Sequence, residues 1–346
     1  MTSVPRDPLT GRPRVRLATL PTPLEEGPVL AGGGRLWVKR DDLTGLGMGG
    51  NKARKLEFLC AEAVESGAGV LVTVGAGQSN HCRMTAAAGA VLGLETHLVL
   101  AGDRPHRLEG NQLLSERFGA QQHFTGAAPA EWGVLEIARE QLADELTDQG
   151  LNVYSMPIGG STAVGALGYL VGFAELMADL HARSLDVASV VVTSSSGGTH
   201  AGLVAGRAWY RETHPTVDVP EIVAIGVAKG VIAGSPSVAD LARAALELAG
   251  LPGAVSDDDV IVDPRWLGDD YAIPTAESRA AARWAARHGA WVLDDVYTAK
   301  GMSGLLGLDV EGRFGDRDAV FIHTGGHPEV FVQHAHSSGQ ETGAGS

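Results

Sequence analysis

Lysine is rare in this chain, and one lysine stands where an amine could do chemistry. The 346 residues contain five lysines: Lys39, Lys52, Lys55, Lys229 and Lys300. Of these, only Lys52 follows a glycine-rich loop, G-L-G-M-G-G-N-K (45–52), at the predicted start of a helix. The positive end of the helix dipole lowers the pKa of an amine, which favours a nucleophile or a base. The same pattern also fits a solvent-facing lysine after a turn.

Three further loops place small or hydrogen-bonding residues directly after predicted apolar strands. They are V-G-A-G-Q-S-N-H-C-R (74–83), T-S-S-S-G-G-T-H-A-G (193–202) and H-T-G-G-H-P-E-V (323–330). Ser79 or Asn80 could cap a helix, or the free N–H groups beside them could bind a carboxylate. Loop 193–202 is either an ordinary turn or a site for a phosphate monoester, held by N–H groups and hydroxyls.

Predicted strands and helices alternate along most of the chain. The predicted strands are 35–40, 69–74, 95–102, 151–157, 187–194, 221–228 and 318–324. The predicted helices are 52–66, 81–93, 110–118, 131–149 and a segment that ends near His181. The first 34 residues are predicted to form an irregular arm, and residues 335–346 a disordered tail. The alternation predicts a doubly wound α/β fold, in which such loops meet at the carboxyl ends of the strands.

Composition narrows the class of protein. A chain of 346 residues favours two domains, and a formal net charge of −14 argues against nucleic acid or an anionic membrane as a partner. No apolar run approaches the roughly 20 residues that span a bilayer, and the N-terminus lacks the apolar segment of a secretory signal. Cys60 and Cys82 are the only cysteines. These features predict a cytoplasmic protein without disulfides.

Two other kinds of site, a dinucleotide loop and a metal site, fit the sequence less well. Gly45, Gly47 and Gly50 fit the spacing of a dinucleotide loop, but R-D-D-L-T intervenes where a strand should lead into the loop. A non-catalytic nucleotide-binding α/β protein therefore stays an alternative only. His323 and His327 are separated by two glycines and have no carboxylate or cysteine companion in the sequence, so no metal is expected.

Six motifs occur together in one order: N-K-A-R-K-L-E, Q-S-N-H, P-I-G-G-S-x-A-x-G-A-L-G-Y, S-G-G-T-H-A-G, Y-T-x-K and H-T-G-G. Between about Pro21 and Phe331 the chain resembles the pyridoxal-phosphate enzymes grouped as D-cysteine desulfhydrase and 1-aminocyclopropane-1-carboxylate deaminase. The resemblance implies the tryptophan-synthase-β-like fold (fold type II), pyridoxal 5′-phosphate as cofactor and a homodimer. It also implies a large lobe of residues 1–52 and 153–334 and a small lobe of residues 53–152.

The resemblance implies a role for each matching residue. Lys52 would hold the cofactor as a Schiff base, Asn80 would lie beside its ring hydroxyl and Thr324 would face its pyridine nitrogen. The implied cofactor-binding residues are Lys52, Asn80, Ser196, Gly197, Gly198, Thr199, Thr324 and Gly325. The implied substrate-binding residues are Ser79, Asn80, His81, Tyr271 and Tyr297. The implied catalytic residues are Lys52, Tyr297, Tyr271 and Ser79.

Three positions favour the desulfhydrase branch of this family. The typical cyclopropane deaminase has Q-S-N-Q where this chain has Q-S-N-H, with His81 as the last residue. It also has an acidic residue after the second tyrosine, where this chain has Thr298, and Leu in the H-T-G-G motif, where this chain has Thr324. The implied reaction is α,β-elimination on a small amino acid, with D-cysteine giving pyruvate, sulfide and ammonia. L-Cysteate sulfo-lyase, 1-aminocyclopropane-1-carboxylate deaminase and D-serine or chloroalanine lyase stay alternatives.

Four residues depart from the family pattern: Cys82, Asp269, Asp270 and His327. Asp269 and Asp270 flank Tyr271, so we expect them to alter the substrate end of the pocket rather than the cofactor end.

Overall fold

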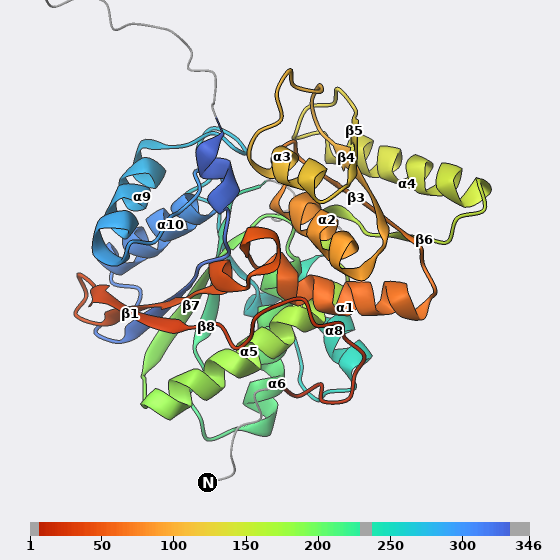
Figure 1. Ribbon diagram of the computed structural model, residues 1–346. Coiled ribbons are helices and arrows are strands. Elements are labelled where there is room, and N and C mark those ends of the chain that lie inside the picture. Colours follow the sequence, from red (N-terminus) through yellow and green to blue (C-terminus); the bar gives the residue numbers. More distant parts are fainter. Residues whose placement is uncertain (1–6, 229–236, 333–346) are drawn as a thin grey trace, which may run out of the picture.

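Two sheets organise the computed structural model, which describes residues 7–228 and 237–332 (Figure 1). The large sheet has six strands in the order β1-β2-β10-β7-β8-β9. Its strands are β1 (Leu24–Val29), β2 (Arg35–Lys39), β7 (Val187–Ser194), β8 (Glu221–Gly226), β9 (Ile261–Asp263) and β10 (Asp318–Ile322). The small sheet has the order β5-β4-β3-β6 and all its strands are parallel. Its strands are β3 (Val70–Gly75), β4 (Glu95–Leu100), β5 (Gln121–Phe124) and β6 (Val153–Ser155).

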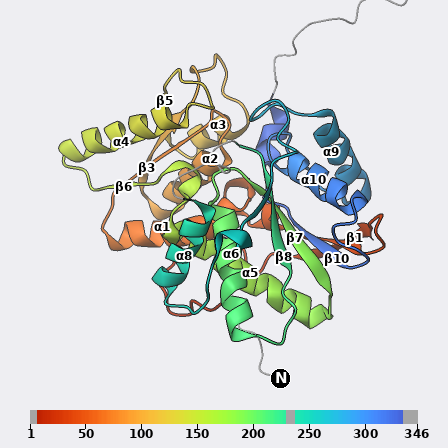
Figure 2. The ribbon, with the colours of Figure 1, turned by 180° about the vertical axis from the view of Figure 1, so that it is seen from behind.

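Helices cover both faces of the large sheet, as the view from behind also shows (Figure 2). One face carries α5 (Ala163–Arg183), α6 (Gly198–Thr213) and α8 (Val238–Ala249), and the other carries α9 (Ala276–Gly289) and α10 (Thr298–Val310). Val190 and Val192 pack with the first group, whereas Val191 packs with the second. This alternation explains why the strand is apolar throughout, because successive side chains point to opposite buried faces.

The small sheet is covered in the same way. Val70, Val72 and Val74 pack against α4 (Trp132–Asp148), and Leu71 packs in a cluster with residues of α1 (Lys52–Glu65) and α2 (Asn80–Leu92). The remaining short elements are α3 (Gly110–Arg117), η1 (Asp41–Leu43), η2 (Leu46–Met48), η3 (Ile158–Gly160), η4 (Asp257–Asp259) and η5 (His327–Phe331).

The predicted doubly wound α/β architecture is confirmed, and each predicted strand and helix matches an observed one to within a few residues. The prediction of an irregular arm over the first 34 residues was wrong in part, because residues 24–29 form β1, which pairs antiparallel with β2. β1 was missed because L-E-E-G-P-V lacks an apolar pattern and contains a proline, which an edge strand tolerates. The predicted tail, 335–346, lies outside the described residues. The lobe boundaries stay a prediction, since the small sheet itself extends to Ser155.

Helix α5 is the one helix of the described residues that is long and apolar enough to cross a membrane. However, 83% of its apolar stretch is buried inside the protein. Leu167, Leu170 and Phe173 of this helix belong to the core cluster of the large sheet. Packing in a protein core therefore accounts for its hydropathy.

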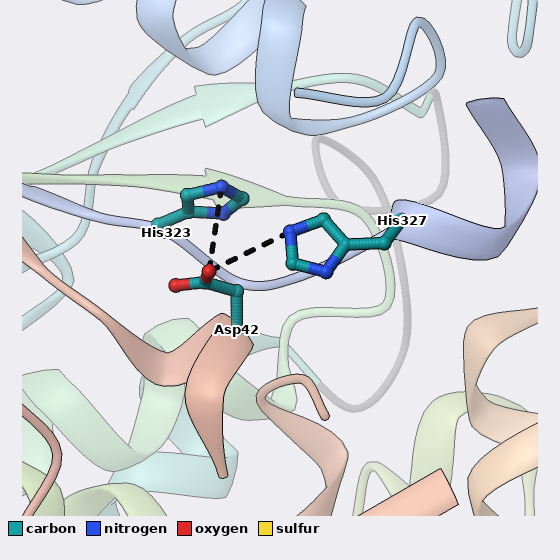
Figure 3. A group of neighbouring side chains, drawn as sticks. All are labelled: Asp42, His323 and His327. Carbon is teal, nitrogen blue, oxygen red and sulfur yellow. Dashed lines mark ion pairs between the residues drawn. The ribbon is translucent and has the colours of Figure 1, made fainter. Parts of the chain in front are cut away.

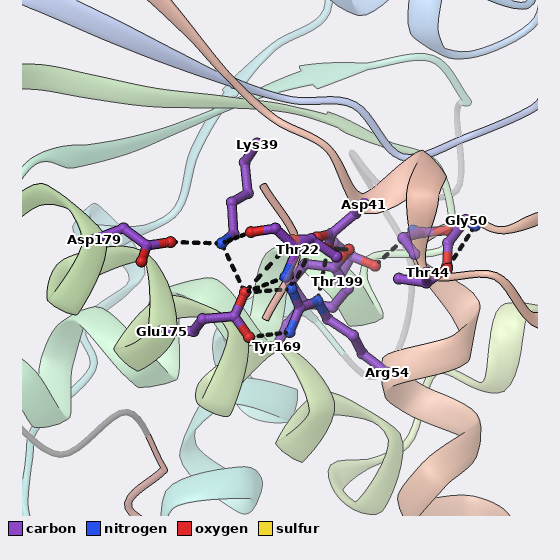
Figure 4. A network of polar contacts seen from close by, with 11 residues as sticks. Thr22, Lys39, Asp41, Thr44, Gly50, Arg54, Tyr169, Glu175, Asp179 and Thr199 are labelled. Carbon is purple, nitrogen blue, oxygen red and sulfur yellow. Dashed lines mark hydrogen bonds and ion pairs between the residues drawn. The ribbon is translucent and has the colours of Figure 1, made fainter. Parts of the chain in front are cut away.

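A buried ionic network fixes the start of α1 against the large sheet (Figure 4). The guanidinium of Arg54 contacts Asp41 at 2.8 Å and Glu175 of α5 at 2.9 Å. Lys39, at the end of β2, contacts Glu175 at 2.6 Å and Asp179 at 2.8 Å. Arg54 is only 1% exposed, so each charge depends on its partners rather than on water.

Replacing Arg54 by Met should destabilise the protein strongly. The change leaves Asp41 buried without its guanidinium partner, and breaking a buried ion pair from one side costs about 3–5 kcal/mol. The free energy of unfolding, measured by urea denaturation, would show this loss. Arg317→Met is the matched control, because the pairs of Arg317 with Asp186 and Asp218 lie near the surface and should contribute about 0–1 kcal/mol. Equal effects of the two substitutions would contradict a structural role for the network.

Candidate active site

A cavity of about 350 Å³ lies where the carboxyl ends of the two sheets meet. Gly75 and Ala76 reach it from the end of β3, Thr193–Ser196 from the end of β7, and Thr324 from the end of β10. Ligands of open α/β sheets bind at this edge, so the cavity is the candidate active site.

The cavity brings together almost all of the residues that the sequence predicted. Its lining includes Lys52, Ser79, Asn80, His81, Ser196, Gly197, Thr199, Tyr271, Tyr297, Thr324 and Gly325. The one predicted residue outside the lining is Gly198, which begins α6 directly behind it. Asp269 and Asp270 do not line the cavity as formed by the described residues, and the carboxylate of Asp270 accepts a hydrogen bond from the N–H of Tyr271 at 2.8 Å. Cys82 is also away from the cavity, buried under α2.

The amine of Lys52 is prepared to lose its proton. Burial, followed by the charge of the nearby Arg83, lowers the pKa of Lys52 to about 8. Its Nζ lies 3.3 Å from Oδ1 of Asn51, and no carboxylate among the described residues pairs with it. An amine with this pKa is neutral more often than an ordinary lysine, as a nucleophile requires.

A phosphate-sized cradle adjoins the start of α6. Lys55 donates from Nζ to the carbonyl of Gly159 at 2.6 Å, and its Nζ lies 3.4 Å from Oγ of Ser161. Oγ of Ser161 in turn lies 2.9 Å from Oγ of Ser196. A Cβ on Gly198 would stand 2.4 Å from Nζ of Lys55, so only glycine lets the helix start approach the ammonium group.

The hydroxyl of Ser194 adds a further donor to this cradle. It is buried and has no hydrogen-bond partner among the described residues. An amine, hydroxyls and the N–H groups of a helix start together suit a phosphate dianion. Lys55 and Ser161 were missed as cradle residues. The position of Lys55, one helical turn after Lys52 in a lysine-poor chain, was the available signal.

Hydrogen bonds fix the amide of Asn80. Its Oδ1 accepts from Arg83 at 3.2 Å and from Nδ2 of Asn111 at 3.1 Å. Because both donors occupy the oxygen, the NH₂ group is left to face the cavity, where it can donate to a ligand oxygen. Ser79 is the N-cap of α2, since its Oγ accepts from the N–H of Cys82 at 3.2 Å. It also lines the cavity, so capping does not exclude contact with a ligand.

His81 is neutral. Its Nε2 lies 2.9 Å from the hydroxyl of Thr73, which itself donates to the carbonyl of Met156 at 3.0 Å. Thr73 must therefore accept from Nε2–H of His81. Burial, with the charges of Lys52 and Lys55, lowers the pKa of His81 well below its usual value. His81 can offer a ligand a neutral ring but not a positive charge.

Two tyrosines close the other end of the cavity. The hydroxyls of Tyr271 and Tyr297 are hydrogen-bonded to each other, and Trp132 of α4 stands edge-on to Tyr271 with ring centres 5.4 Å apart. Burial raises the pKa of both phenols, so both keep their protons at neutral pH. Trp132 and Glu136 of α4 also line the cavity and carried no signal in the sequence, because contact across the two sheets brings them there.

Asp294 holds the loop that carries Tyr297. Its carboxylate accepts from the N–H groups of Val296 at 3.1 Å, Tyr297 at 2.7 Å and Thr298 at 3.2 Å. The hydroxyl of Thr298 donates to the same carboxylate at 2.6 Å. A Cβ on Gly326 would lie 2.1 Å from this carboxylate. Asp294 therefore joins the tyrosine loop to the turn that bears the predicted Thr324. No sequence pattern indicated this role for Asp294.

One cluster corrects an argument made from the sequence (Figure 3). Asp42 supplies the carboxylate companion that His323 and His327 were thought to lack, at 3.9 Å and 3.5 Å from their Nε2 atoms. However, Arg40 already binds both oxygens of Asp42, at 2.7 and 2.9 Å. The N–H of Gly325 donates to Nδ1 of His323, which leaves the ring proton on Nε2, where the described residues offer no hydrogen-bond partner. A protonated Nε2 cannot bind a metal, and the absence of a metal stays a prediction.

Comparison with known proteins places the chain in a family. The sequence model of the family described as "Pyridoxal-phosphate dependent enzyme" matches residues 15–325. This chain belongs to that family. It is 38% identical to "D-cysteine desulfhydrase" of Klebsiella pneumoniae (strain 342), over 95% of this chain and 98% of that protein. It is also 38% identical to "D-cysteine desulfhydrase" of Salmonella choleraesuis (strain SC-B67), over 96% and 100%.

Solved structures agree with this placement. A crystal structure described as the "ACC deaminase homologue" superposes with a TM-score of 0.82 at 35% identity and covers 94% of this chain and 95% of that one. A fungal L-serine ammonia-lyase from Rhizomucor miehei, at 18% identity and a TM-score of 0.62, shares the fold. The predicted family, its fold type and its cofactor are therefore confirmed.

The observed cradle fits pyridoxal 5′-phosphate. The orphaned hydroxyl of Ser194 suits its phosphate, and the low pKa of Lys52 suits its aldehyde. Lys55 stands behind the cavity lining, beside Ser161, and burial, followed by the charge of Lys52, lowers the pKa of Lys55 well below its usual value. A phosphate dianion next to Ser161 would favour the protonated form of this amine.

Asp294→Asn tests the structural role of Asp294. An amide nitrogen in place of one carboxylate oxygen would face N–H and O–H donors, and buried donors without partners should cost about 3 kcal/mol in total. Urea denaturation of the cofactor-free protein measures this loss. Asp269→Asn, an exposed change beside Tyr271, is the control and should alter stability by less than about 0.5 kcal/mol. A stability of Asp294→Asn equal to that of the control would refute the assignment.

Proposed function

We propose that the protein is a D-cysteine desulfhydrase, which converts D-cysteine and water into pyruvate, sulfide and ammonia. One arrangement carries the proposal: a lysine of lowered pKa stands between a phosphate cradle and a pair of protonated tyrosines. The similarity to the desulfhydrases of Klebsiella and Salmonella, over nearly the full length of each chain, supports the same activity.

The cofactor would be held at three points. Lys55, Ser194, Ser196 and the N–H groups of Gly197, Gly198 and Thr199 would bind its phosphate. The NH₂ group of Asn80 would donate to the ring oxygen, and Thr324, with Gly325 behind it, would place a hydroxyl at the pyridine nitrogen. When bound to Lys52, pyridoxal phosphate supplies an electron sink for the bond that breaks at Cα of the substrate.

The side chains of this protein would then move the protons. The amine of Lys52, neutral because of its lowered pKa, would remove the Cα proton of the substrate. Ser79 and Asn80, with His81 behind them, would orient the substrate carboxylate at the start of α2. The paired hydroxyls of Tyr271 and Tyr297, which stay protonated, would donate a proton to the departing sulfur. A hydroxyl at the pyridine nitrogen gives a modest electron sink, which suits elimination because the leaving group carries the charge away.

The electrostatics of the cavity argue against a sulfonate substrate. Among the described residues that line it, Lys52 is the one lysine or arginine, whereas Glu136 and Asp294 both bring carboxylates. Burial lowers the pKa of His200 to about 4, and His81 is neutral too, so neither histidine offers a sulfonate a positive charge. We therefore favour D-cysteine desulfhydrase over L-cysteate sulfo-lyase as the activity.

One position of the chain argues against ring opening of a cyclopropane substrate. Of the three positions at which the cyclopropane deaminases differ from this chain, one is an acidic residue where Thr298 stands. The hydroxyl of Thr298 is bound to Asp294 and does not line the cavity, so it cannot replace that acid. The lobe boundaries at residues 52 and 152, the homodimer and the cytoplasmic location stay proposals. The buried, unpaired Cys60 and Cys82 agree with a reducing compartment.

A comparison of candidate substrates tests the proposed activity directly. The purified protein should show the visible absorption of lysine-bound pyridoxal phosphate, and Lys52→Ala should abolish it. At equal concentration, pyruvate should form faster from D-cysteine than from L-cysteine, L-cysteate or D-serine, and faster than 2-oxobutyrate forms from 1-aminocyclopropane-1-carboxylate. Sulfide release from D-cysteine is the matching second readout. If L-cysteate were the best substrate, with release of sulfite, the desulfhydrase assignment would be wrong while the cofactor assignment stood.

Lys55→Met should weaken binding of the cofactor through its phosphate alone. Loss of a charge-assisted contact with a phosphate costs about 1.5–3 kcal/mol, which corresponds to an increase in Kd of roughly 10- to 150-fold. Titration of the cofactor-free protein with pyridoxal phosphate measures this change. Pyridoxal without the phosphate is the control ligand, and its weaker binding should be unchanged. An equal loss for both ligands would show that Lys55 acts on the pocket as a whole.

A further inference from the structure

Arg83 is a buried cation that lies just outside the cavity. It projects from α2, is completely buried and does not line the pocket. Its guanidinium donates to the carbonyls of Gly47 and Gly49, the second at 3.0 Å, and to Oδ1 of Asn80 at 3.2 Å. One side chain thus contacts both the loop that leads to Lys52 and the amide expected to meet the cofactor.

These contacts explain the glycine-rich loop. Gly47, Gly49 and Gly50 adopt φ of +49°, +76° and +130°, a region that L side chains rarely enter. This backbone path turns carbonyl oxygens toward a cation. A nucleotide loop would turn N–H groups toward a phosphate instead. The dinucleotide reading of Gly45–Gly50 is therefore unsupported, and the loop fits Arg83.

Arg83 differs from Arg54 in its counter-ions. Arg54 contacts two carboxylates, but no carboxylate among the described residues forms an ion pair with Arg83. Burial lowers even the pKa of Arg83, to about 9. An unpaired buried charge is costly to keep, so a fold that retains one needs a compensating use for it.

The nearby group on which the charge of Arg83 acts is Lys52. The charged and titratable groups that act on Lys52 in the described structure are Arg83, Lys55 and His81, and none of them is a carboxylate. A second positive charge beside an amine favours its neutral form, because two like charges in a low-dielectric site repel. The neutral form is the one that can attack an aldehyde or accept a proton.

We propose that Arg83 is a positioning residue of the lysine site, which holds the glycine loop and Asn80 together and whose unpaired charge adds to burial in favouring the neutral amine of Lys52. The inference rests on the proposed function only in taking Lys52 as the lysine that binds the cofactor. It assigns Arg83 two separable tasks, one that depends on its charge and one that depends on its planar shape.

Site-resolved labelling tests the charge without the cofactor. The cofactor-free protein would be acetylated with acetic anhydride at a series of pH values, and mass spectrometry would follow each of the five lysines. Half-maximal labelling of Lys52 should fall near pH 8 in the native protein. In Arg83→Met it should move up by about 1 pH unit, so that labelling at pH 7.5 is about eightfold slower. Arg83→Lys keeps a charge and should leave the midpoint unchanged.

Cofactor affinity tests the shape. Lysine cannot reproduce the planar fork of arginine, so Arg83→Lys should bind pyridoxal phosphate about tenfold more weakly despite a normal labelling midpoint. Arg83→Met should show both defects. Arg207→Met removes an arginine of α6 that contacts Asp259 away from the cavity, and it should show neither. Circular dichroism confirms folding, and Arg83→Gln replaces Arg83→Met if the latter does not fold.

Each outcome decides one part of the inference. An unchanged labelling midpoint in folded Arg83→Met would overturn the electrostatic task. Native affinity for pyridoxal phosphate in Arg83→Lys would overturn the positioning task. Failure of the native protein to bind pyridoxal phosphate would count against the proposed function instead, because the labelling result does not depend on the cofactor.

Discussion

The buried pairing of Arg54 with Asp41 and Glu175 is the constraint on which the site depends. It ties the first turn of α1 to the large sheet, while the rest of α1 packs under the small sheet. Residues two apart on a helix point to nearly opposite sides, so anchoring Arg54 on the sheet directs Lys52 toward the cavity. The lysine site is thus positioned from behind, by charges that never meet the ligand.

The two arginines of this region show how pairing decides the effect of a buried charge. Arg54 has its counter-ions within 3 Å and acts as a clamp, without a first-order effect on the pocket. Arg83 is hydrogen-bonded only to neutral carbonyl and amide oxygens, and its Nε has no partner among the described residues, so no counter-ion offsets its charge near Lys52.

Much of this site could be predicted, because the loops that follow parallel strands all lie at the same edge of the sheet. Lys52, Asn80, Thr199 and Thr324 follow or adjoin such strands, and the structure gathers them around one cavity. Trp132 and Asp294 could not be found in this way. Trp132 reaches the cavity from a helix of the other sheet, and Asp294 matters through backbone N–H groups that no sequence pattern reveals. The strand β1 escaped for a related reason, since an edge strand needs no apolar alternation.

The position after Tyr297 shows why a motif is only a partial guide to specificity. An acidic residue and a threonine there differ in charge, but the structure adds that Thr298 does not line the cavity and that its hydroxyl donates to Asp294, which does. The acid at this end of the cavity is then Asp294 itself, whose oxygens are already filled by four donors. A carboxylate so occupied cannot serve as a base toward a substrate. Proton transfer at this end therefore falls to the phenols of Tyr271 and Tyr297, whose raised pKa values make them donors, as a departing thiolate requires.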